Sequence, residues 1–229
     1  MGAAALGLAA LGALAGCSGE EGGGDDRAPE DVLAEARATL DETSGVRLSL
    51  ATDELPEGVL GVTEASGVAT HEPGLAFEGS ITVPLAGSEF EVPVVSVDGT
   101  VYAQIPLTPG WSEVDPSEYG APDPATLLDP ESGLSALLTE TEDVVAGEAV
   151  RGGEGNRDVL TEYTGTVPGD AVAGVIPTAS GDFDVVYTIT DDGELRGAEL
   201  TGAFYPGGDT LTYELELDDY GLEQEITAP

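Results

Sequence analysis

The feature of this sequence that most restricts its fold is a two-residue alternation of apolar and polar or small side chains. Successive side chains of a β-strand point to opposite faces of the sheet, so each such segment has one apolar and one polar face. This pattern is typical of antiparallel sheets that bury one face and leave the other in water. The alternation covers residues 46–51, 77–85, 90–94, 101–105, 183–189, 198–204 and 211–217.

Turn signals separate several of these segments. Asp98-Gly99 precedes Val101, and an Asp-Gly pair between two alternating runs is a strong hairpin signal. Asp191-Asp192-Gly193 and Pro206-Gly207-Gly208 separate the later segments. No motif returns at a fixed long period, which argues against a propeller or a solenoid.

Three stretches have helical character instead. Pro29 opens the first, acidic residues fill its first turn, and Ser44-Gly45 ends it. Its apolar residues recur at helical spacing, and they are Val32, Leu33, Ala36 and Leu40. Shorter helices are expected near residues 134–138 and 168–175. Each must bury an apolar side, and the sheet is the only large apolar surface available to it.

A long antiparallel meander twists and curls. If it curls without closing, it forms a half-barrel with an apolar concave face under the helices. The fold class expected from these residues is α+β dominated by β-structure. The residues alone leave two outcomes open, an apolar hollow and a tightly packed core, and packing is the commoner one.

The N-terminal segment has a different character. Residues 3–15 are apolar, uncharged and too short for a comfortable membrane span, as in a signal peptide. The run ends at Leu14-Ala15-Gly16-Cys17, which resembles a bacterial lipobox and implies acylation of Cys17 and cleavage before it. No basic residue precedes the run, and we expect this to reflect a start site placed too late.

The expected organisation therefore has three parts. Residues 1–16 are a lipoprotein signal peptide, and residues 17–28 hold the lipidated cysteine and a flexible Gly- and Asp-rich tether. Residues 29–229 are expected to form a single folded domain. The predicted location is the extracytoplasmic face of the cell membrane, within the cell envelope, with several acyl chains making the anchorage stable.

The charge balance excludes some partners. The chain has 45 Asp and Glu against six Arg and no Lys, which gives a net charge of −39. Nucleic-acid binding requires a basic surface, and docking of the protein surface on anionic lipid headgroups requires one too. Adaptation to a salty environment is one explanation of the acidity, and a lineage that favours acidic surfaces is the other.

A series of short motifs occurs in a fixed order along the chain. They are Val97-Asp98-Gly99-Thr100-Val101-Tyr102-Ala103, Trp111, Asp115-Pro116, Tyr119-Gly120, Asp123-Pro124, Leu127-Leu128-Asp129-Pro130, Gly133-Leu134, Leu137-Leu138 and Thr164-Gly165-Thr166-Val167-Pro168. The series resembles the LppX/LprG lipoprotein family of actinobacteria, and so does the order of lipobox, tether, helix, hairpins, Pro-rich insert and closing hairpins. The resemblance covers essentially the whole mature chain.

The resemblance implies a U-shaped antiparallel half-barrel with helices over its concave face, enclosing an apolar cavity. This fold is also similar to that of the LolA/LolB lipoprotein carriers of Gram-negative bacteria. The family is thought to bind acylated lipids and glycolipids and to carry them across the envelope, and its association with export machinery implies a membrane lipid exporter as partner. This chain is far more acidic than the mycobacterial members, so the cargo is not carried over.

Strand parity and the resemblance together give the residues expected to line the cavity. They are Phe77, Ile81, Val83, Phe90, Val92, Val94, Leu134, Leu137, Phe183, Val185, Tyr187, Leu211 and Tyr213. The ordinary alternative is that each belongs to a packed core. Trp111 is expected to anchor the Pro-rich insert against the sheet, with a gate at the cavity mouth as the alternative.

Catalytic and metal-binding residues are scarce, so we expect no enzyme and no cofactor. His71 is the only histidine, and it lies in an expected turn beside Pro73. No Gly-x-Ser-x-Gly motif is present, and Cys17 is assigned to lipid. The Asp-Pro pairs at Asp115, Asp123 and Asp129 favour turns over calcium binding. The competing functions are an anchored structural or interaction module with a packed core and a hydrolase of envelope lipids.

Overall fold

The computed structural model describes residues 27–229 except positions 54, 57, 60, 86, 120, 153–156 and 208. The predicted signal peptide, Cys17 and nearly all of the predicted tether lie outside the described residues. The α-helices are α1 (Pro29–Glu42), α2 (Leu134–Glu140) and α3 (Gly169–Val175), and two short 3-10 helices, η1 (Pro116–Tyr119) and η2 (Pro124–Leu128), lie between β6 and α2. The strands are β1 (Gly45–Ala51), β2 (Glu64–Thr70), β3 (Ala76–Leu85), β4 (Ser88–Val97), β5 (Thr100–Ala103), β6 (Ser112–Val114), β7 (Glu142–Gly152), β8 (Asp158–Val167), β9 (Ser180–Thr190), β10 (Leu195–Ala203) and β11 (Leu211–Asp218).

All the strands of the described chain belong to one antiparallel sheet of 11 strands, in the order β6-β5-β4-β3-β2-β1-β11-β10-β9-β8-β7. The first and last strands pair in its middle, with Leu48 opposite Leu217 and Leu50 opposite Leu215. The outer strands β6 and β7 do not pair with each other, so the sheet stays open. This confirms the prediction of an open, β-dominated antiparallel fold.

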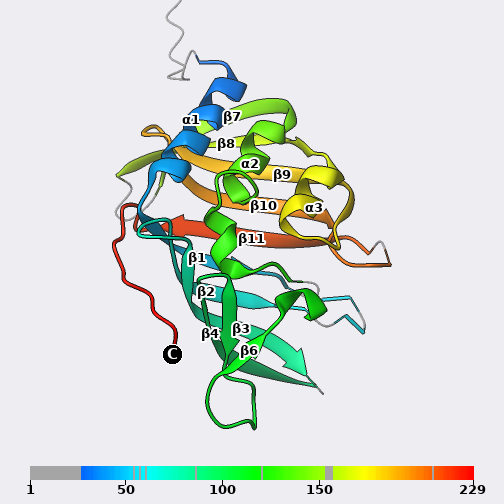
Figure 1. The fold of residues 1–229 in the computed structure, drawn as a ribbon. Coiled ribbons are helices and arrows are strands. Elements are labelled where there is room, and N and C mark those ends of the chain that lie inside the picture. The colour runs from blue at the N-terminus through cyan, green and yellow to red at the C-terminus, as the bar shows by residue number, and fades with distance from the viewer. Residues whose placement is uncertain are drawn as a thin grey trace, which may run out of the picture.

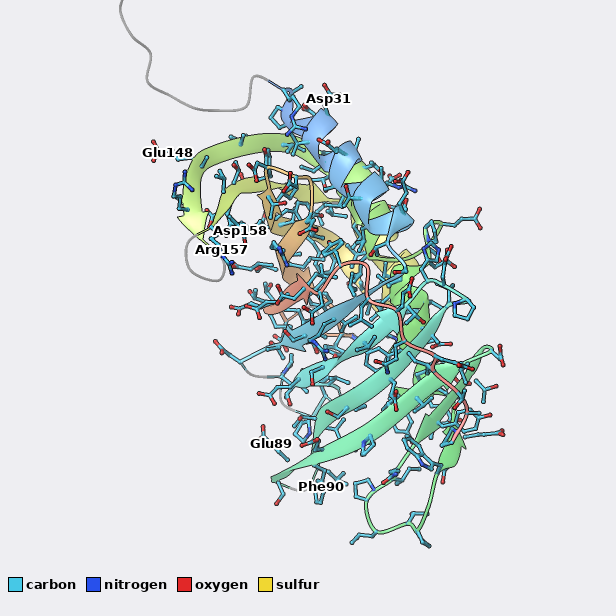
Figure 2. All side chains as sticks on the ribbon, turned by 90° about the vertical axis from the view of Figure 1, so that its left-hand side faces the viewer. Asp31, Glu89, Phe90, Glu148, Arg157 and Asp158 are labelled. Carbon is cyan, nitrogen blue, oxygen red and sulfur yellow. The ribbon has the colours of Figure 1, made fainter. Side chains whose placement is uncertain are left out.

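The helices all cover the same face of the sheet (Figure 1), which we call the concave face. α3 packs on β9, α1 packs on α2, and η2 packs on β2, β3 and β4. The C-terminal residues after β11 run along the opposite, outer face (Figures 1 and 2). There Ile226 packs with Ala76 and Val95 in a small second cluster.

The predicted helices form where the sequence pattern placed them. α1 buries the four apolar residues that were expected to face the sheet, namely Val32, Leu33, Ala36 and Leu40. Pro168 caps the start of α3, as a proline near a helix N-terminus does. The turn at Asp98-Gly99 has positive φ at both residues, 54° and 72°, as a type I′ hairpin requires.

Glycines on the concave face leave room for aromatic rings. A Cβ on Gly67 or Gly79 would lie within 2.8 Å of the Phe77 ring, and one on Gly202 would collide with the Phe183 ring. Both phenylalanines are fully buried. The small residues in these strands therefore allow large side chains from neighbouring strands to lie flat against the sheet.

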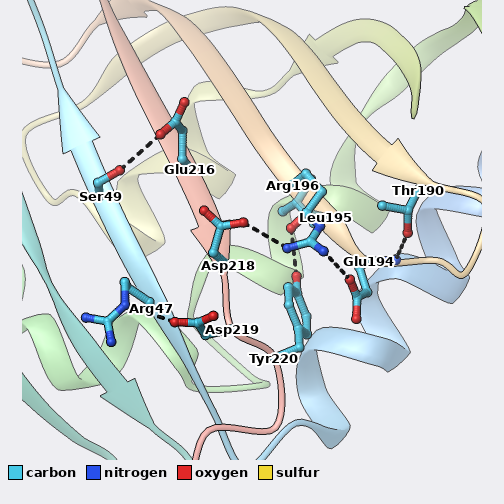
Figure 3. A network of polar contacts seen from close by, with 10 residues as sticks. All are labelled: Arg47, Ser49, Thr190, Glu194, Leu195, Arg196, Glu216, Asp218, Asp219 and Tyr220. Carbon is cyan, nitrogen blue, oxygen red and sulfur yellow. Dashed lines mark hydrogen bonds and ion pairs between the residues drawn. The ribbon is translucent and has the colours of Figure 1, made fainter. Parts of the chain in front are cut away.

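The outer face of the central strands carries ion pairs (Figure 3). Arg196 lies 2.8 Å from Asp218 and 3.1 Å from Glu194, and Arg47 lies 3.1 Å from Asp219. Tyr220 donates a hydrogen bond to the Leu195 carbonyl at 2.8 Å, and burial raises its pKa. These contacts lie around β11, β1 and β10 on the side away from the helices.

Candidate functional site: the concave apolar face

Strand register places the predicted cavity residues on one face of the sheet. Ile81 pairs with Val92 and Val83 pairs with Phe90, so the side chains of each pair lie side by side. On the other side of β1, Leu200 of β10 pairs with both Val185 and Tyr213. The eleven predicted residues on strands thus share the concave face, and Leu134 and Leu137 belong to α2, which covers it.

Twelve of the thirteen residues also pack into one hydrophobic cluster, and Phe90 is the exception. Phe90 is half-buried at the start of β4 and lies outside this cluster. Parity along the strands was therefore a sound guide to which residues are neighbours. Clustering alone does not decide between a cavity lining and a packed core.

The two halves of the concave face differ in how far they are covered. In the β7–β11 half, Phe183, Val185 and Tyr187 are at most 2% exposed, so side chains of the protein fill the space above them. In the β3–β4 half, Phe77, Val92 and Val94 are buried as well, but Ile81 and Val83 are only half-buried. We call these the closed half and the open half of the concave face.

The two tyrosine hydroxyls on the concave face, those of Tyr187 and Tyr213, are satisfied by the protein itself. The Tyr187 hydroxyl lies 3.1 Å from Thr141 Oγ1, and burial raises the pKa of Tyr187 to about 12. The Tyr213 hydroxyl donates to the Val62 carbonyl at 2.7 Å and lies 2.8 Å from the Tyr205 hydroxyl. Burial raises the pKa of Tyr213 as well. Neutral, hydrogen-bonded hydroxyls keep this face apolar in character.

A buried serine holds η2 over the open half. Ser96, which is 0% exposed, donates to Asp123 Oδ1 at 2.5 Å. The same carboxylate oxygen accepts a hydrogen bond from Ala125 N at 3.0 Å and so caps η2. The predicted turn role of Asp123 is confirmed, and its physical effect is to fix the insert against β4.

A hollow of about 730 Å³ lies at the margin of the open half, between β5, β6, η2 and the end of α3. Its apolar walls include Val101, Val114 and Val175, and its polar walls include Asp115 and Thr126. Ligand pockets commonly measure about 300–1,000 Å³, so its size suits a ligand. A second hollow of about 440 Å³ lies on the outer face, around Ser66 and Ser80.

None of the thirteen predicted residues lines either of these two hollows. Val101 and Val114 were not among the predicted site residues, although Val101 belongs to the alternating segment 101–105. The register Val101–Val114 shows that both face the concave side. Strand β6 has only three residues, so its sequence shows too short an alternation to predict that Val114 faces the concave side.

Trp111 lies away from the concave cluster. It packs with Val97 and Tyr102 against the second cluster on the outer face. The expected anchoring of the insert against the sheet therefore occurs on the outer side. This placement does not bring Trp111 to the face that the predicted cavity residues share, and it gives the gate alternative no support.

Two further features of the described residues bear on chemistry. No group of three or more His, Cys, Asp or Glu side chains there is arranged to hold a metal ion. Within the same part of the chain, no helix combines the length and the apolar character needed to cross a membrane. Asp115 accepts two hydrogen bonds from Ser117, and these lower the pKa of Asp115.

An open antiparallel sheet with helices over one apolar face is the architecture of a known class of lipoproteins. The chain belongs to the LppX_LprAFG lipoprotein family, whose model matches residues 28–226. This confirms the resemblance seen in the ordered motifs. No curated protein matches the sequence.

Solved structures show the same fold. LprF from Mycobacterium bovis is 16% identical with a TM-score of 0.69, and the match covers 88% of this chain and 96% of that one. LppX from Mycobacterium tuberculosis is 18% identical with a TM-score of 0.64, covering 89% and 100%. At these identities the likeness concerns the fold alone.

Proposed function

We propose that this protein is a lipid-anchored lipoprotein of the cell envelope that binds acylated lipids or glycolipids on the open half of its concave face. We further propose that it transfers them across the envelope, with a membrane lipid exporter as partner. Family membership supports the coarser statement, a lipid-binding lipoprotein. In this proposal Cys17 carries the lipid anchor, and this anchor holds the protein on the extracytoplasmic face of the cell membrane.

One observation carries the proposal: apolar side chains on the open half are incompletely covered by the protein. Ile81 and Val83 are half-buried, and the 730 Å³ hollow lies at the margin of the same half. Each methylene removed from water contributes about 0.8 kcal/mol, so an acyl chain laid along this face is held without specific polar contacts. A carrier needs this kind of binding, because the same surface then accepts chains of different length.

The closed half gives the open half a rigid frame. Phe183 and Tyr187 of β9 and Leu217 of β11 are fully or almost fully buried, and Leu217 lies opposite Leu48 of β1. A chain bound beside β3 and β4 therefore meets a preformed surface, which lowers the entropic cost of binding. In the serine–carboxylate pair of the open half, Ser96 is buried and Asp123 caps η2, so the pair offers no accessible nucleophile, which favours a carrier over a hydrolase.

The decisive test is substitution of Ile81 by Trp in the full chain. On a lipid-binding surface the larger ring occupies the acyl position, so lipid co-purification should fall while the free energy of unfolding stays nearly constant. In a packed core the same change costs about 1–3 kcal/mol. Mass spectrometry of organic extracts measures bound lipid, and urea denaturation measures stability.

Ser80→Trp provides a matched control on the neighbouring residue of the same strand. Ser80 faces the outer hollow, which has room for a ring, so this variant should keep both lipid and stability. Loss of stability in Ile81→Trp with unchanged lipid content would support the packed structural module instead. Absence of lipid from the unsubstituted protein, together with no uptake of a fluorescent acyl probe, would refute the proposed function.

A further inference from the structure

Three exposed apolar side chains occur at two separate loops, at the end of the molecule away from α1. Leu85 ends β3 at the β3–β4 hairpin and is 51% exposed, and Ile105 and Leu107 lie in the connection between β5 and β6 with 38% and 102% exposure. Both views place this hairpin and this connection at the end of the molecule opposite α1 (Figures 1 and 2), and Glu89 and Phe90, labelled in Figure 2, lie on β4 beside the hairpin. We call Leu85, Ile105 and Leu107 the apolar tip.

The backbone conformation at Leu107 is energetically unfavourable for a leucine. Thr108 N donates to the Ile105 carbonyl at 3.0 Å, which closes a turn with Leu107 at its third position. Leu107 has a φ of +69°, where glycine or asparagine is the usual residue. The other described non-glycine residues with positive φ are all aspartates, namely Asp98, Asp143 and Asp219, and aspartate tolerates this region better than leucine.

A fully exposed leucine in a strained conformation gains nothing from burial within its own molecule. Such local strain is retained at functional positions, where the side chain is needed for another purpose. Exposed apolar side chains rimmed by polar surface mark sites that contact another molecule or a membrane. The tip therefore points to a contact outside the protein.

The charge distribution indicates what that contact is. Residues 79–88 and 99–112 contain no charged side chain, although Asp, Glu and Arg make up 22% of the chain. A net charge of −39 repels anionic headgroups from the remaining surface. The exposed Glu89 and Glu113 directly follow these two ranges, so an apolar tip with carboxylates beside it is suited to a lipid surface without net charge.

A protein partner fits the tip less well. Stable protein interfaces bury about 800 Å² on each partner with complementary shapes. The tip instead consists of separate side chains on two turns. A few apolar side chains are enough to enter the boundary between headgroups and acyl chains.

We propose that the apolar tip enters the surface of an electrically neutral lipid layer and brings the open half of the concave face to that surface. Leu85 belongs to the strand that carries Ile81 and Val83, and Phe90 lies opposite Val83 near the same end. A lipid chain leaving the layer at the tip thus meets apolar side chains along its path. This contact is a property beyond lipid binding itself.

Single-tryptophan reporters test the contact directly. Trp111 is the only tryptophan, so Trp111→Phe gives a background into which Leu107→Trp or Val150→Trp is introduced. Val150 is 55% exposed on β7, at the α1 end of the molecule, and serves as the matched position. Residues 1–26 contribute equally to vesicle binding in both reporters.

Phosphatidylcholine vesicles with brominated acyl chains are the probe. The Leu107→Trp reporter should shift to shorter emission wavelength and lose most of its fluorescence, while the Val150→Trp reporter keeps its own. Equal quenching of the two, or none at position 107, would overturn the proposal. Replacing half of the lipid by phosphatidylglycerol should weaken quenching at low salt and restore it near 1 M salt, where screening acts within about 3 Å. Stronger quenching by the anionic vesicles would overturn the assignment to a neutral surface.

A second variant separates the tip contact from folding and from lipid binding. Leu107→Gly places the residue that this turn prefers, so the fold is retained. Loss of one buried leucine on the membrane should slow uptake of a fluorescent acyl probe about tenfold, with the amount bound at equilibrium unchanged. Uptake at the original rate would overturn the role of the tip in loading. If the unsubstituted protein takes up no probe while the Leu107→Trp reporter is still quenched, the proposed lipid binding fails and the tip contact stands.

Discussion

Tyr187 lies at the centre of the closed half, with its side chain 2% exposed. Because burial raises the pKa of Tyr187 to about 12, the folded protein holds this proton at a pH where the unfolded chain, with a tyrosine pKa of about 10, has released it. The stabilisation is fully present below pH 10 and is lost as the pH rises through 12. The free energy of unfolding should fall by roughly 2–3 kcal/mol over that window from this group.

Tyr187→Phe tests this assignment. At pH 7 the loss of the hydrogen bond to Thr141 should cost about 1 kcal/mol, because Thr141 Oγ1 still donates to the Leu137 carbonyl at 2.8 Å. Between pH 8 and 11.5 the variant should lose less stability than the original protein, as measured by urea denaturation. Tyr119 is 54% exposed, so Tyr119→Phe should leave the free energy of unfolding at pH 7 unchanged. An identical alkaline slope in Tyr187→Phe would contradict the assignment.

At the scale of elements, one arginine ties α1 to α2. Arg37 donates to Thr139 Oγ1 at 2.5 Å and to the Pro130 carbonyl at 3.0 Å, and it lies 3.5 Å from Asp41. Hydrogen bonds from a charged donor contribute about 1.5–3 kcal/mol each when well shielded, and less where water competes. Arg37→Ala should therefore lower the free energy of unfolding by about 1–3 kcal/mol in denaturant titrations.

Arg47 supplies the matched control for Arg37. Its pair with Asp219 has side chains 55% and 60% exposed, and exposed pairs contribute about 0–1 kcal/mol. Arg47→Ala should therefore have little effect. Equal losses in the two variants would show that Arg37 does not specifically hold α2 on the concave face.

How much of the fold could be predicted differs from element to element. The strand faces followed from alternation, since parity is a local property, and α1 followed from its spacing and proline. The pairing of β1 with β11 could not be predicted, because it joins segments about 170 residues apart and leaves no local signal. β7 was also missed. Its side chains are nearly all exposed, so no apolar alternation marks it.

The site was predictable to a similar extent. Residues such as Ile81 and Val92 were correctly placed on one face, but their degree of coverage depends on where η2 and the helices come to rest. Trp111 was anticipated as an anchor, whereas its position on the outer face depends on the C-terminal Ile226, which is distant in sequence. Leu107 was not predicted as a functional residue, because the sequence alone does not show whether an apolar side chain is exposed.

For the whole molecule, the dominant long-range term is repulsion among acidic side chains. With a net charge of −39, compaction brings like charges together, and salt relieves the repulsion by screening. Ion pairs such as Arg196 with Asp218 offset only a small part of it, since the chain has six arginines. Stability should therefore rise with salt concentration.

Glu199 and Glu214 give this repulsion a local test. They lie directly opposite each other on β10 and β11 and are both exposed on the outer face. Like charges in this position are destabilising, and opposite charges contribute about 0.2–1 kcal/mol. Glu199→Lys should therefore raise the free energy of unfolding by about 1 kcal/mol at low salt, and the gain should nearly vanish near 1 M salt, where the Debye length is about 3 Å. Glu162→Lys makes the same change of charge on β8 opposite the uncharged Thr188. It therefore measures only the change in stability that comes from the lower net charge. If both variants gain equally at low salt, the cross-strand pair has no effect of its own, and the acidic surface acts on stability only through its total charge.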